Sequence, residues 1–196
     1  MRIACDVDGV LADLHIEWLR RYNADSGDDL KPEEITAWNI QHFVVPEYRT
    51  KIFDYLRADD LYDTVPTIAG SVEGVRELRG LGHRVFFATS CVMGMTDPKW
   101  RWLQRYGYFT EETAQHRSQV DLVMVSDKTL LDAHLLIDDR DQHVAEWVER
   151  DRRAIIFDAP YNQDFEDDIP ANRAPWYKRC YGWEEIVDHV YDMEVV

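Results

Sequence analysis

Short apolar runs recur along the chain, and segments with helical spacing separate them. The runs cover residues 3–7, 85–88, 120–125, 135–137 and 154–157. Continuous apolar runs of this kind are typical of strands that are buried on both faces of a sheet. Apolar residues three or four positions apart predict amphipathic helices over residues 71–81, 98–106, 142–152 and 184–191. This alternation predicts parallel βαβ units and therefore an open α/β sheet.

Residues 15–65 interrupt the alternation, because they are rich in charged and aromatic side chains and have helical rather than strand spacing. Pro66 and Gly70 then precede the helix that starts at Ser71, so a boundary is expected there. We predict a small helical cap over 15–65, inserted after the first strand, and a core made of 1–14 and 66–196. A second irregular stretch, 161–176, carries Pro, Asn and an acidic run, which predicts a long surface loop.

Length and charge limit the classes of function. The 196 residues suit one domain with an insertion, and 45% hydrophobic residues are enough for a core. A net charge of −16 opposes binding to nucleic acid or to an anionic membrane, so neither partner is expected. The sequence shows neither a long apolar span nor a signal peptide, which predicts a cytoplasmic protein. The three cysteines lack the spacing of metal ligands and are odd in number, so they support neither a disulfide framework nor a zinc site. The sequence is compatible with a homodimer as well as with a monomer.

The first predicted strand ends in a pair of carboxylates. Asp6 and Asp8 are two positions apart, so their side chains point to the same side where the strand meets its loop, and Gly9 allows a sharp turn there. Ligands of open α/β sheets bind at the carboxyl ends of the strands. Two adjacent carboxylates offer the hard oxygen ligands that Mg²⁺ prefers. Alone, the motif is equally well explained as a polar turn.

Further polar residues follow the other predicted strands. Thr89 and Ser90 end the second, Lys128 follows the third, and Asp138 and Asp139 end the fourth. On one sheet edge, these residues and the first carboxylate pair supply a nucleophile, hydroxyls, an ammonium group and a second acidic pair. This combination favours phosphoryl transfer, in which one Asp attacks phosphorus while another moves protons at the leaving oxygen and at water. Adjacent strand residues face opposite ways, so one of the second acidic pair should bind metal directly.

Five stretches resemble the haloacid dehalogenase superfamily, and within it the 5'(3')-deoxyribonucleotidases. They are DVDGVLAD (6–13), FFATS (86–90), SDKTLLDAHLLIDDR (126–140), FDAPYNQ (157–163) and GWEEI (182–186). The resemblance implies a Rossmann-like core with a helical cap after the first strand. It also implies an Mg²⁺-dependent phosphatase that releases phosphate from small-molecule (deoxy)ribonucleoside monophosphates through an aspartyl-phosphate intermediate.

Roles for the acidic residues follow from this resemblance. Asp6 is expected to be the nucleophile and a metal ligand. Asp8 is expected to be the acid/base, with its backbone carbonyl on the metal. The resemblance favours Asp139 as the direct ligand from the second pair, with Asp138 orienting a metal-bound water.

The resemblance also assigns residues around the phosphate and the nucleoside. Thr89 and Lys128 match catalytic positions that bind the phosphate, Ser90 lies beside them, and Lys99 is similar to a second lysine near the phosphate. In the cap, Phe43 resembles the residue that stacks on the base. An apolar surface of Phe43 and Val44 is expected to pack against the sugar edge, where a ribose would bury an unpaired hydroxyl. Trp38 and Tyr55 are further candidates for nucleotide contacts.

Two alternatives remain beside the nucleotidase. One is a phosphatase of the same fold that acts on sugar phosphates or other small phosphomonoesters, which a panel of substrates would separate. The other is a non-catalytic nucleotide-binding relative. The intact set of Asp6, Asp8, Thr89, Lys128 and Asp139 opposes it, because a binding module does not need both carboxylates of the first motif.

Overall fold

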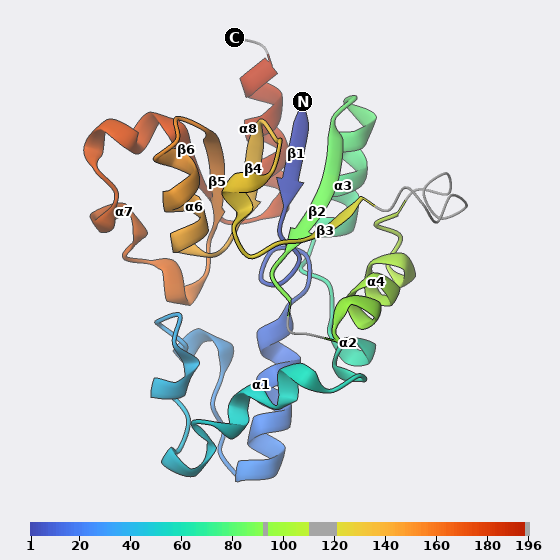
Figure 1. The fold of residues 1–196 in the computed structure, drawn as a ribbon, viewed down its shortest axis with the longest axis vertical. Helices are drawn as coiled ribbons and strands as arrows, with labels where there is room; N and C mark the ends of the chain where they lie inside the picture. Colours follow the sequence, from blue (N-terminus) through green and yellow to red (C-terminus); the bar gives the residue numbers. More distant parts are fainter. Residues whose placement is uncertain (92–93, 110–120, 195–196) are drawn as a thin grey trace.

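A computed structural model describes residues 1–91, 94–109 and 121–194 of the chain. Its centre is a fully parallel sheet of six strands in the order β3-β2-β1-β4-β5-β6 (Figure 1). The strands are β1 (Arg2–Cys5), β2 (Arg84–Thr89), β3 (Leu122–Met124), β4 (Leu135–Asp138), β5 (Arg153–Phe157) and β6 (Tyr177–Cys180). The α/β class and the parallel sheet that the sequence predicts are therefore confirmed.

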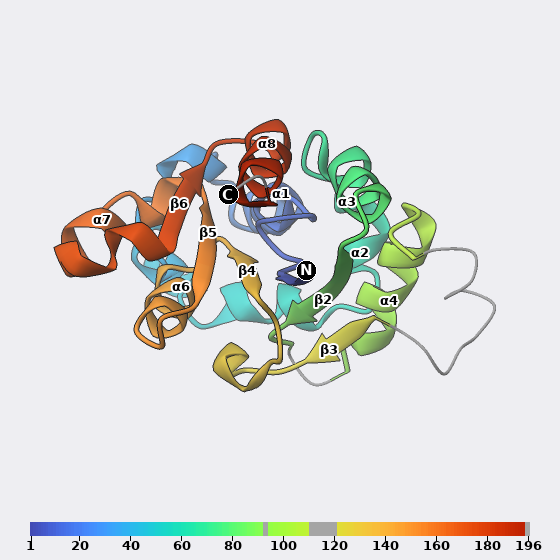
Figure 2. The ribbon, with the colours of Figure 1, turned by 90° about the horizontal axis from the view of Figure 1, so that it is seen from above.

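Helices cover both faces of this sheet, as the view from above shows (Figure 2). The core helices are α3 (Ser71–Gly80), α4 (Thr96–Arg105), α6 (Asp141–Val148), α7 (Phe165–Asp168) and α8 (Trp183–Glu194). Successive strand residues face opposite ways, so Ile3 and Cys5 pack in the cluster that contains the side chains of α3 and α8, while Ala4 packs in the cluster of α6. Burial on both faces explains why the strands are continuously apolar.

The strand order creates a crevice between β1 and β4. From β1 the chain moves outward to β2 and β3, and then crosses to the other side of β1 to form β4. At such a switch point the two neighbouring crossovers leave in opposite directions, which opens a ligand site at the carboxyl ends of the strands. Asp6 directly follows β1, and Asp138 is the last residue of β4. The topology thus places both acidic motifs at one crevice.

The structure corrects the sequence interpretation of the C-terminal third. The predicted loop over 161–176 contains α7 and short 3-10 turns at Pro160–Asn162 and Ala171–Trp176, and β6 follows it as a strand that was not predicted. β6 has four residues and lies at the sheet edge, where Lys178 is exposed, so it lacks the apolar run of a central strand. Of the strand predicted over 120–125, Val120 lies outside the described residues.

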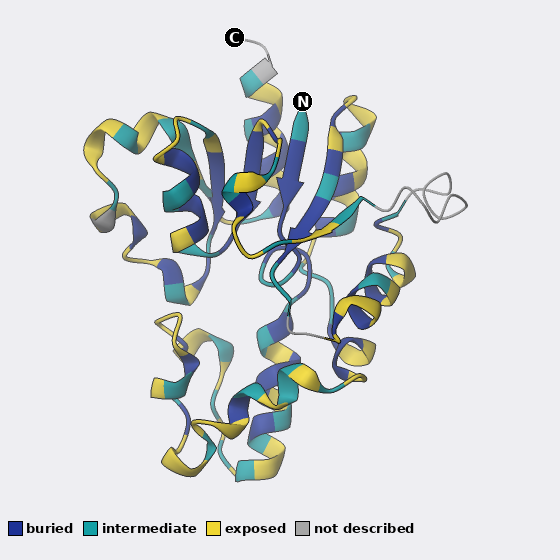
Figure 3. Ribbon diagram, viewed as in Figure 1, coloured by how far each residue is buried: buried dark blue, intermediate teal, exposed yellow. Residues whose placement is uncertain are grey.

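The segment predicted as a cap lies at the carboxyl ends of the strands, below the sheet in Figure 1. It contains α1 (Leu14–Ser26), α2 (Leu61–Thr64) and five 3-10 turns at Pro32–Glu34, Ile40–His42, Pro46–Tyr48, Lys51–Phe53 and Tyr55–Arg57. Trp18, Leu19, Tyr22 and Ile52 form part of a separate hydrophobic cluster in this segment. Its outer surface is largely exposed (Figure 3), whereas Leu61 and Tyr62 join the cluster of the core. In the described part of the chain, no helix combines the length and apolar character that a membrane span requires.

Candidate active site

Three buried carboxylates meet at the crevice between β1 and β4. Asp6, Asp138 and Asp139 each offer an oxygen within 4.8 Å of those of the other two, and all three side chains are buried. Adjacent strands bring them together, because the residues that follow β1 lie beside the end of β4. Three buried carboxylates repel one another strongly unless cations compensate their charge.

Lys128 supplies one of these cations. Its Nζ lies 2.9 Å from Asp6 Oδ1 and 2.6 Å from Asp138 Oδ2, and the lysine is buried. Burial opposes ionisation of Asp138, but Lys128 and His143, whose Nδ1 is 3.1 Å from Asp138 Oδ2, lower the pKa of Asp138 to about 2. Burial raises the pKa of Asp6 to about 6, against the attraction of Lys128. Lys128 therefore pairs most strongly with Asp138, and Asp6 keeps an incompletely compensated carboxylate.

Of the three carboxylates, Asp139 is the one whose negative charge is stabilised least by the described groups around it. Burial raises its pKa well above the usual range, and the charges of Asp6 and Asp138 raise it further. The Tyr161 hydroxyl donates a hydrogen bond to Asp139 Oδ2, and Asn162 Nδ2 donates to its backbone carbonyl at 2.7 Å. Among the described residues, no donor reaches Asp139 Oδ1, although that oxygen is buried. A buried carboxylate oxygen without a donor, beside Asp6, could bind a cation.

Asp8 belongs to a second polar network at the same edge. Lys99 Nζ lies 2.5 Å from Asp8 Oδ2 and donates to Thr89 Oγ1 at 2.7 Å and to the Ser90 carbonyl at 3.1 Å. The Tyr62 hydroxyl donates to Asp8 Oδ1. Lys99 comes from α4 and Tyr62 from α2, so two helices hold the carboxyl beside the residues at the end of β2. The structure thus brings Asp8, Thr89, Ser90 and Lys99 together.

Gly9 is required by the packing of the first motif. Its φ is +76°, and a Cβ at this position would lie 2.1 Å from Asp139 Oδ2 and 2.9 Å from the Tyr161 hydroxyl. We expect Gly9→Ala to lower the free energy of unfolding by about 2–4 kcal/mol, because backbone strain and displacement of Asp139 add together. The rate of phosphate release should also fall, because Asp139 is displaced. Urea denaturation and a phosphate assay measure both effects.

Gly27→Ala is a matched control for this substitution. Gly27 has a φ of +75° but no neighbouring atom within 4 Å of the added Cβ. The Gly27→Ala variant should lose only about 1 kcal/mol of unfolding free energy, from the strained backbone alone, and should keep its activity. Equal losses of stability and activity in the two variants would show that contact between residue 9 and Asp139 is unimportant.

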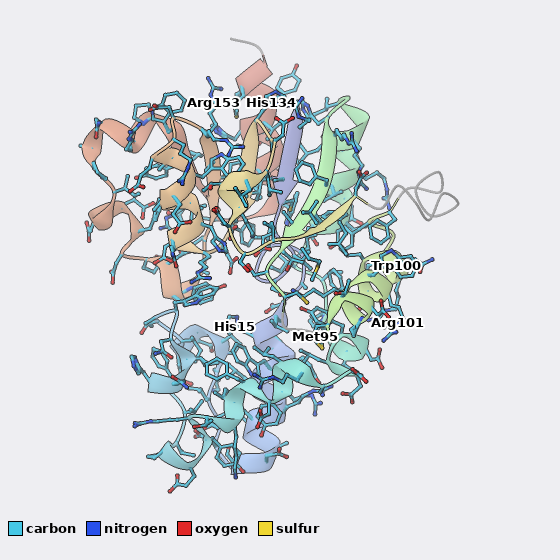
Figure 4. All side chains as sticks on the ribbon, viewed as in Figure 1. His15, Met95, Trp100, Arg101, His134 and Arg153 are labelled. Carbon is cyan, nitrogen blue, oxygen red and sulfur yellow. The ribbon has the colours of Figure 1, made fainter. Side chains whose placement is uncertain are left out.

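A cavity of about 230 Å³ connects these carboxylates to the cap. Its polar end is lined by Asp6, Asp8, Thr89, Ser90, Asp139 and His143. Its apolar wall is lined by Leu14, Trp18, Trp38, Ile40, Phe53 and Leu56. Tyr161 and His15 lie where these parts meet, and Figure 4 shows His15 at the junction between α1 and the core. The cavity can therefore accept a molecule with a polar end and an apolar, planar end.

Of the four cap residues predicted from the sequence, the structure places Trp38 at this cavity. Trp38 is 48% exposed, and its ring lies 4.7 Å from the Arg140 guanidinium and 5.5 Å from the Tyr161 ring. Phe43, Val44 and Tyr55 are not among its lining residues. Val44 is buried in the hydrophobic cluster of the cap, Phe43 packs against that cluster, and the Tyr55 hydroxyl donates to Asp25 Oδ2 at 2.8 Å. The structure therefore does not place these three at the cavity that the carboxylates and Trp38 share.

Several residues at the site were missed by the sequence analysis. Tyr161 and Asn162, which contact Asp139, lie in the FDAPYNQ stretch, so a signal for them was present. Tyr62 and His143 carry no local signal, because a tyrosine before an acidic residue and a histidine on a helix are common patterns. The aromatic residues Trp18 and Phe53, whose rings are 6.1 Å apart, also line the cavity, and aromatic residues on cap helices are expected more often in a hydrophobic core than at a ligand site.

A parallel sheet with an Asp-Lys-Asp cluster at its carboxyl edge and a covering cap is the architecture of a phosphatase of the haloacid dehalogenase superfamily. Over residues 1–190 the chain matches the family described as 5' nucleotidase, deoxy (pyrimidine), cytosolic type C protein. The chain belongs to this family, and it is a phosphoric monoester hydrolase that acts on nucleotide phosphomonoesters.

Individual relatives agree with this membership. A Bordetella pertussis protein provisionally named a 5'(3')-deoxyribonucleotidase is 34% identical over 85% of this chain and 88% of its own length. The 5'(3')-deoxyribonucleotidase of Bacillus subtilis is 27% identical over 94% of this chain and 95% of its own. A crystal structure of a HAD family hydrolase from Deinococcus radiodurans has the same fold, with a TM-score of 0.57, 16% identity and coverage of 94% and 92%.

Proposed function

We propose that this protein is an Mg²⁺-dependent deoxyribonucleotidase, which hydrolyses deoxyribonucleoside monophosphates to nucleoside and phosphate through an aspartyl-phosphate on Asp6. The observation that carries the proposal is the cavity, whose two ends differ in chemistry. One end is lined by the carboxylates and by Thr89, which the buried Lys99 contacts, while the other presents the rings of Trp18, Trp38 and Phe53. A planar base suits this aromatic wall, whereas a sugar phosphate would bury several hydroxyls there without partners.

The donor set fits a hard divalent cation. Asp6 and Asp139 would hold Mg²⁺ through carboxylate oxygens, and the resemblance adds the backbone carbonyl of Asp8. The buried Asp139 Oδ1, which has no donor among the described residues, supports this assignment. Asp138 is already paired with Lys128 and His143, so it suits a supporting role. Bound Mg²⁺ would stabilise the negative charge on the oxygens of the transferring phosphoryl group.

The chain's own residues then account for the two chemical steps. In the first, an Asp6 carboxylate oxygen forms a bond to phosphorus while the bond to the ester oxygen breaks, and Asp8 gives its proton to that oxygen. In the second, Asp8 takes a proton from water, whose oxygen attacks phosphorus, and the bond to Asp6 breaks. Lys128, 2.9 Å from Asp6, keeps a positive charge beside the nucleophile throughout.

Lys99 links the proton-transfer residue to the phosphate position. Its ammonium contacts both Asp8 and Thr89, so a phosphate bound at Thr89 would share this cation with Asp8. When the ammonium turns to the phosphate, the Asp8 carboxyl is released from its contact with Lys99 and can face the leaving oxygen. Lys99 thereby couples substrate binding to the protonation of the leaving oxygen.

The decisive experiment measures phosphate release from deoxyribonucleoside, ribonucleoside and sugar monophosphates, with and without Mg²⁺. We expect release to require the cation and to be fastest with deoxyribonucleotides. Discrimination against one extra hydroxyl in an apolar site should stay at or below about 100-fold in kcat/KM. Faster hydrolysis of a sugar phosphate than of any nucleotide would instead favour the general phosphatase, and the absence of turnover would favour a binding protein.

Trp38→Ala adds a test of the aromatic wall to this panel. Loss of stacking should lower kcat/KM for thymidine 5'-monophosphate by about 10- to 100-fold, and the loss should exceed that for a small aryl phosphate. Tyr181→Ala is the control, because Tyr181 is an aromatic residue that is 67% exposed and outside the cavity lining. If Trp38→Ala leaves the relative rates of the two substrates unchanged, Trp38 does not contact the base.

A further inference from the structure

His15 is a polar side chain in an otherwise apolar part of the cavity wall. It lies on the first turn of α1 and lines the cavity together with other cap residues, which are apolar or aromatic. It falls outside the motifs of the first strand, and neither the metal nor the phosphoryl chemistry uses it. Figure 4 shows it at the boundary between cap and core.

Two aromatic rings hold the imidazole in place. The centroid of the His15 ring lies 5.7 Å from that of Trp18, one turn further along α1, and 5.1 Å from that of Tyr161. The Tyr161 hydroxyl in turn donates to Asp139. His15 and Asp8 line the same cavity, and the charge of that carboxylate acts on the imidazole. The imidazole therefore lies between the acidic cluster and the aromatic wall.

The ring nitrogens of His15 are available to a ligand. Across residues 1–91, 94–109 and 121–194, no side chain or backbone group forms a hydrogen bond with them. Burial lowers the pKa of His15 to about 4, so the neutral ring offers one N–H donor and one acceptor nitrogen. A polar group in a largely apolar wall favours a ligand that can pair with it over one that cannot.

The sugar of a bound nucleotide would occupy this intermediate position. If the phosphate lies at Asp6 and Thr89 and the base lies against Trp18 and Trp38, the furanose ring between them passes His15. A 2'-deoxynucleoside 5'-monophosphate carries a single free sugar hydroxyl, at C3'. We propose that His15 is a specificity-determining residue whose imidazole hydrogen-bonds the 3'-hydroxyl of the substrate. This inference rests on the proposed nucleotidase function.

A pair of substrates that differ in this hydroxyl tests the proposal. For the wild type, kcat/KM for thymidine 5'-monophosphate should exceed that for 3'-deoxythymidine 5'-monophosphate by about 10- to 100-fold. His15→Phe keeps an aromatic ring against Trp18 and Tyr161 but removes both nitrogens, so the ratio should fall close to one. His15→Gln, which has a donor and an acceptor, should retain part of the preference.

Ile16→Ala serves as the control, because Ile16 is the next residue of α1 and is 46% exposed. It should keep the wild-type ratio. The proposal is overturned if the wild type does not discriminate between the two nucleotides, a measurement that needs no variant. It is equally overturned if His15→Phe lowers both rates by the same factor, which would indicate a structural role. Failure of the wild type to hydrolyse either nucleotide, with hydrolysis of an aryl phosphate intact, would contradict the nucleotidase function itself.

Discussion

Asp6→Asn is expected to abolish phosphate release from deoxyribonucleotides, with a loss of about 10⁴-fold or more. The amide nitrogen cannot attack phosphorus, and the neutral side chain is a poorer metal ligand than a carboxylate. The fold should persist, because Lys128 keeps its closer partner Asp138 at 2.6 Å. Rates of phosphate release and the mass of the acid-quenched protein measure the effect. The wild type should show one added phosphoryl group during turnover, and the variant none.

Asp13→Asn provides the matched control for this charge removal. Asp13 ends the same motif stretch but does not line the cavity; its half-buried carboxyl lies at the start of α1, beside the backbone of Ile16. It should retain turnover within about threefold of the wild type, because the substitution leaves the cavity lining unchanged. Residual activity of Asp6→Asn above about one hundredth of the wild-type rate would exclude Asp6 as the nucleophile.

Lys128→Met should affect both stability and turnover, because it leaves Asp6 and Asp138 buried without their shared cation. Removing one member of a buried ion pair typically costs about 3–5 kcal/mol. Protons can replace the missing charge, so the loss of unfolding free energy should be smaller near pH 5 than near pH 8. In metal-free buffer, urea denaturation at both pH values measures this difference. Turnover should fall by about 10³-fold or more, because the charge beside the nucleophile is lost.

Lys178→Met is the corresponding control, since Lys178 is an exposed lysine on the edge strand β6. Its stability should change by less than about 0.5 kcal/mol at either pH. A destabilisation of Lys128→Met no larger than this would mean that the three carboxylates are compensated in another way. Equal losses near pH 5 and near pH 8 would show that protonation of Asp6 and Asp138 does not relieve the missing charge.

Local sequence predicted which polar side chains gather at the carboxyl edge of the sheet. Asp6, Thr89 and Asp138 each follow or end an apolar strand, and parallel strands deliver such residues to one edge of a sheet whatever the details of packing. The alternation of strands and helices therefore predicted both the fold class and the group of side chains at its carboxyl edge. The edge strand β6 escaped prediction because a short, half-exposed strand has no continuous apolar run.

Tertiary structure alone decided which cap residues line the cavity. The cap is built mostly of 3-10 turns, whose directions depend on packing between distant segments, so sequence spacing does not reveal which aromatic rings point inward. Trp38 therefore lines the cavity while Phe43 packs against the cap cluster. The same holds for Tyr62, which reaches Asp8 from 54 positions away, and for His15, which meets the ring of Tyr161 only in the folded chain. Residues at the ends of strands can be assigned to the site from sequence, because the strand itself places them there. Residues that line the cavity from the cap cannot, because their positions depend on packing between distant segments.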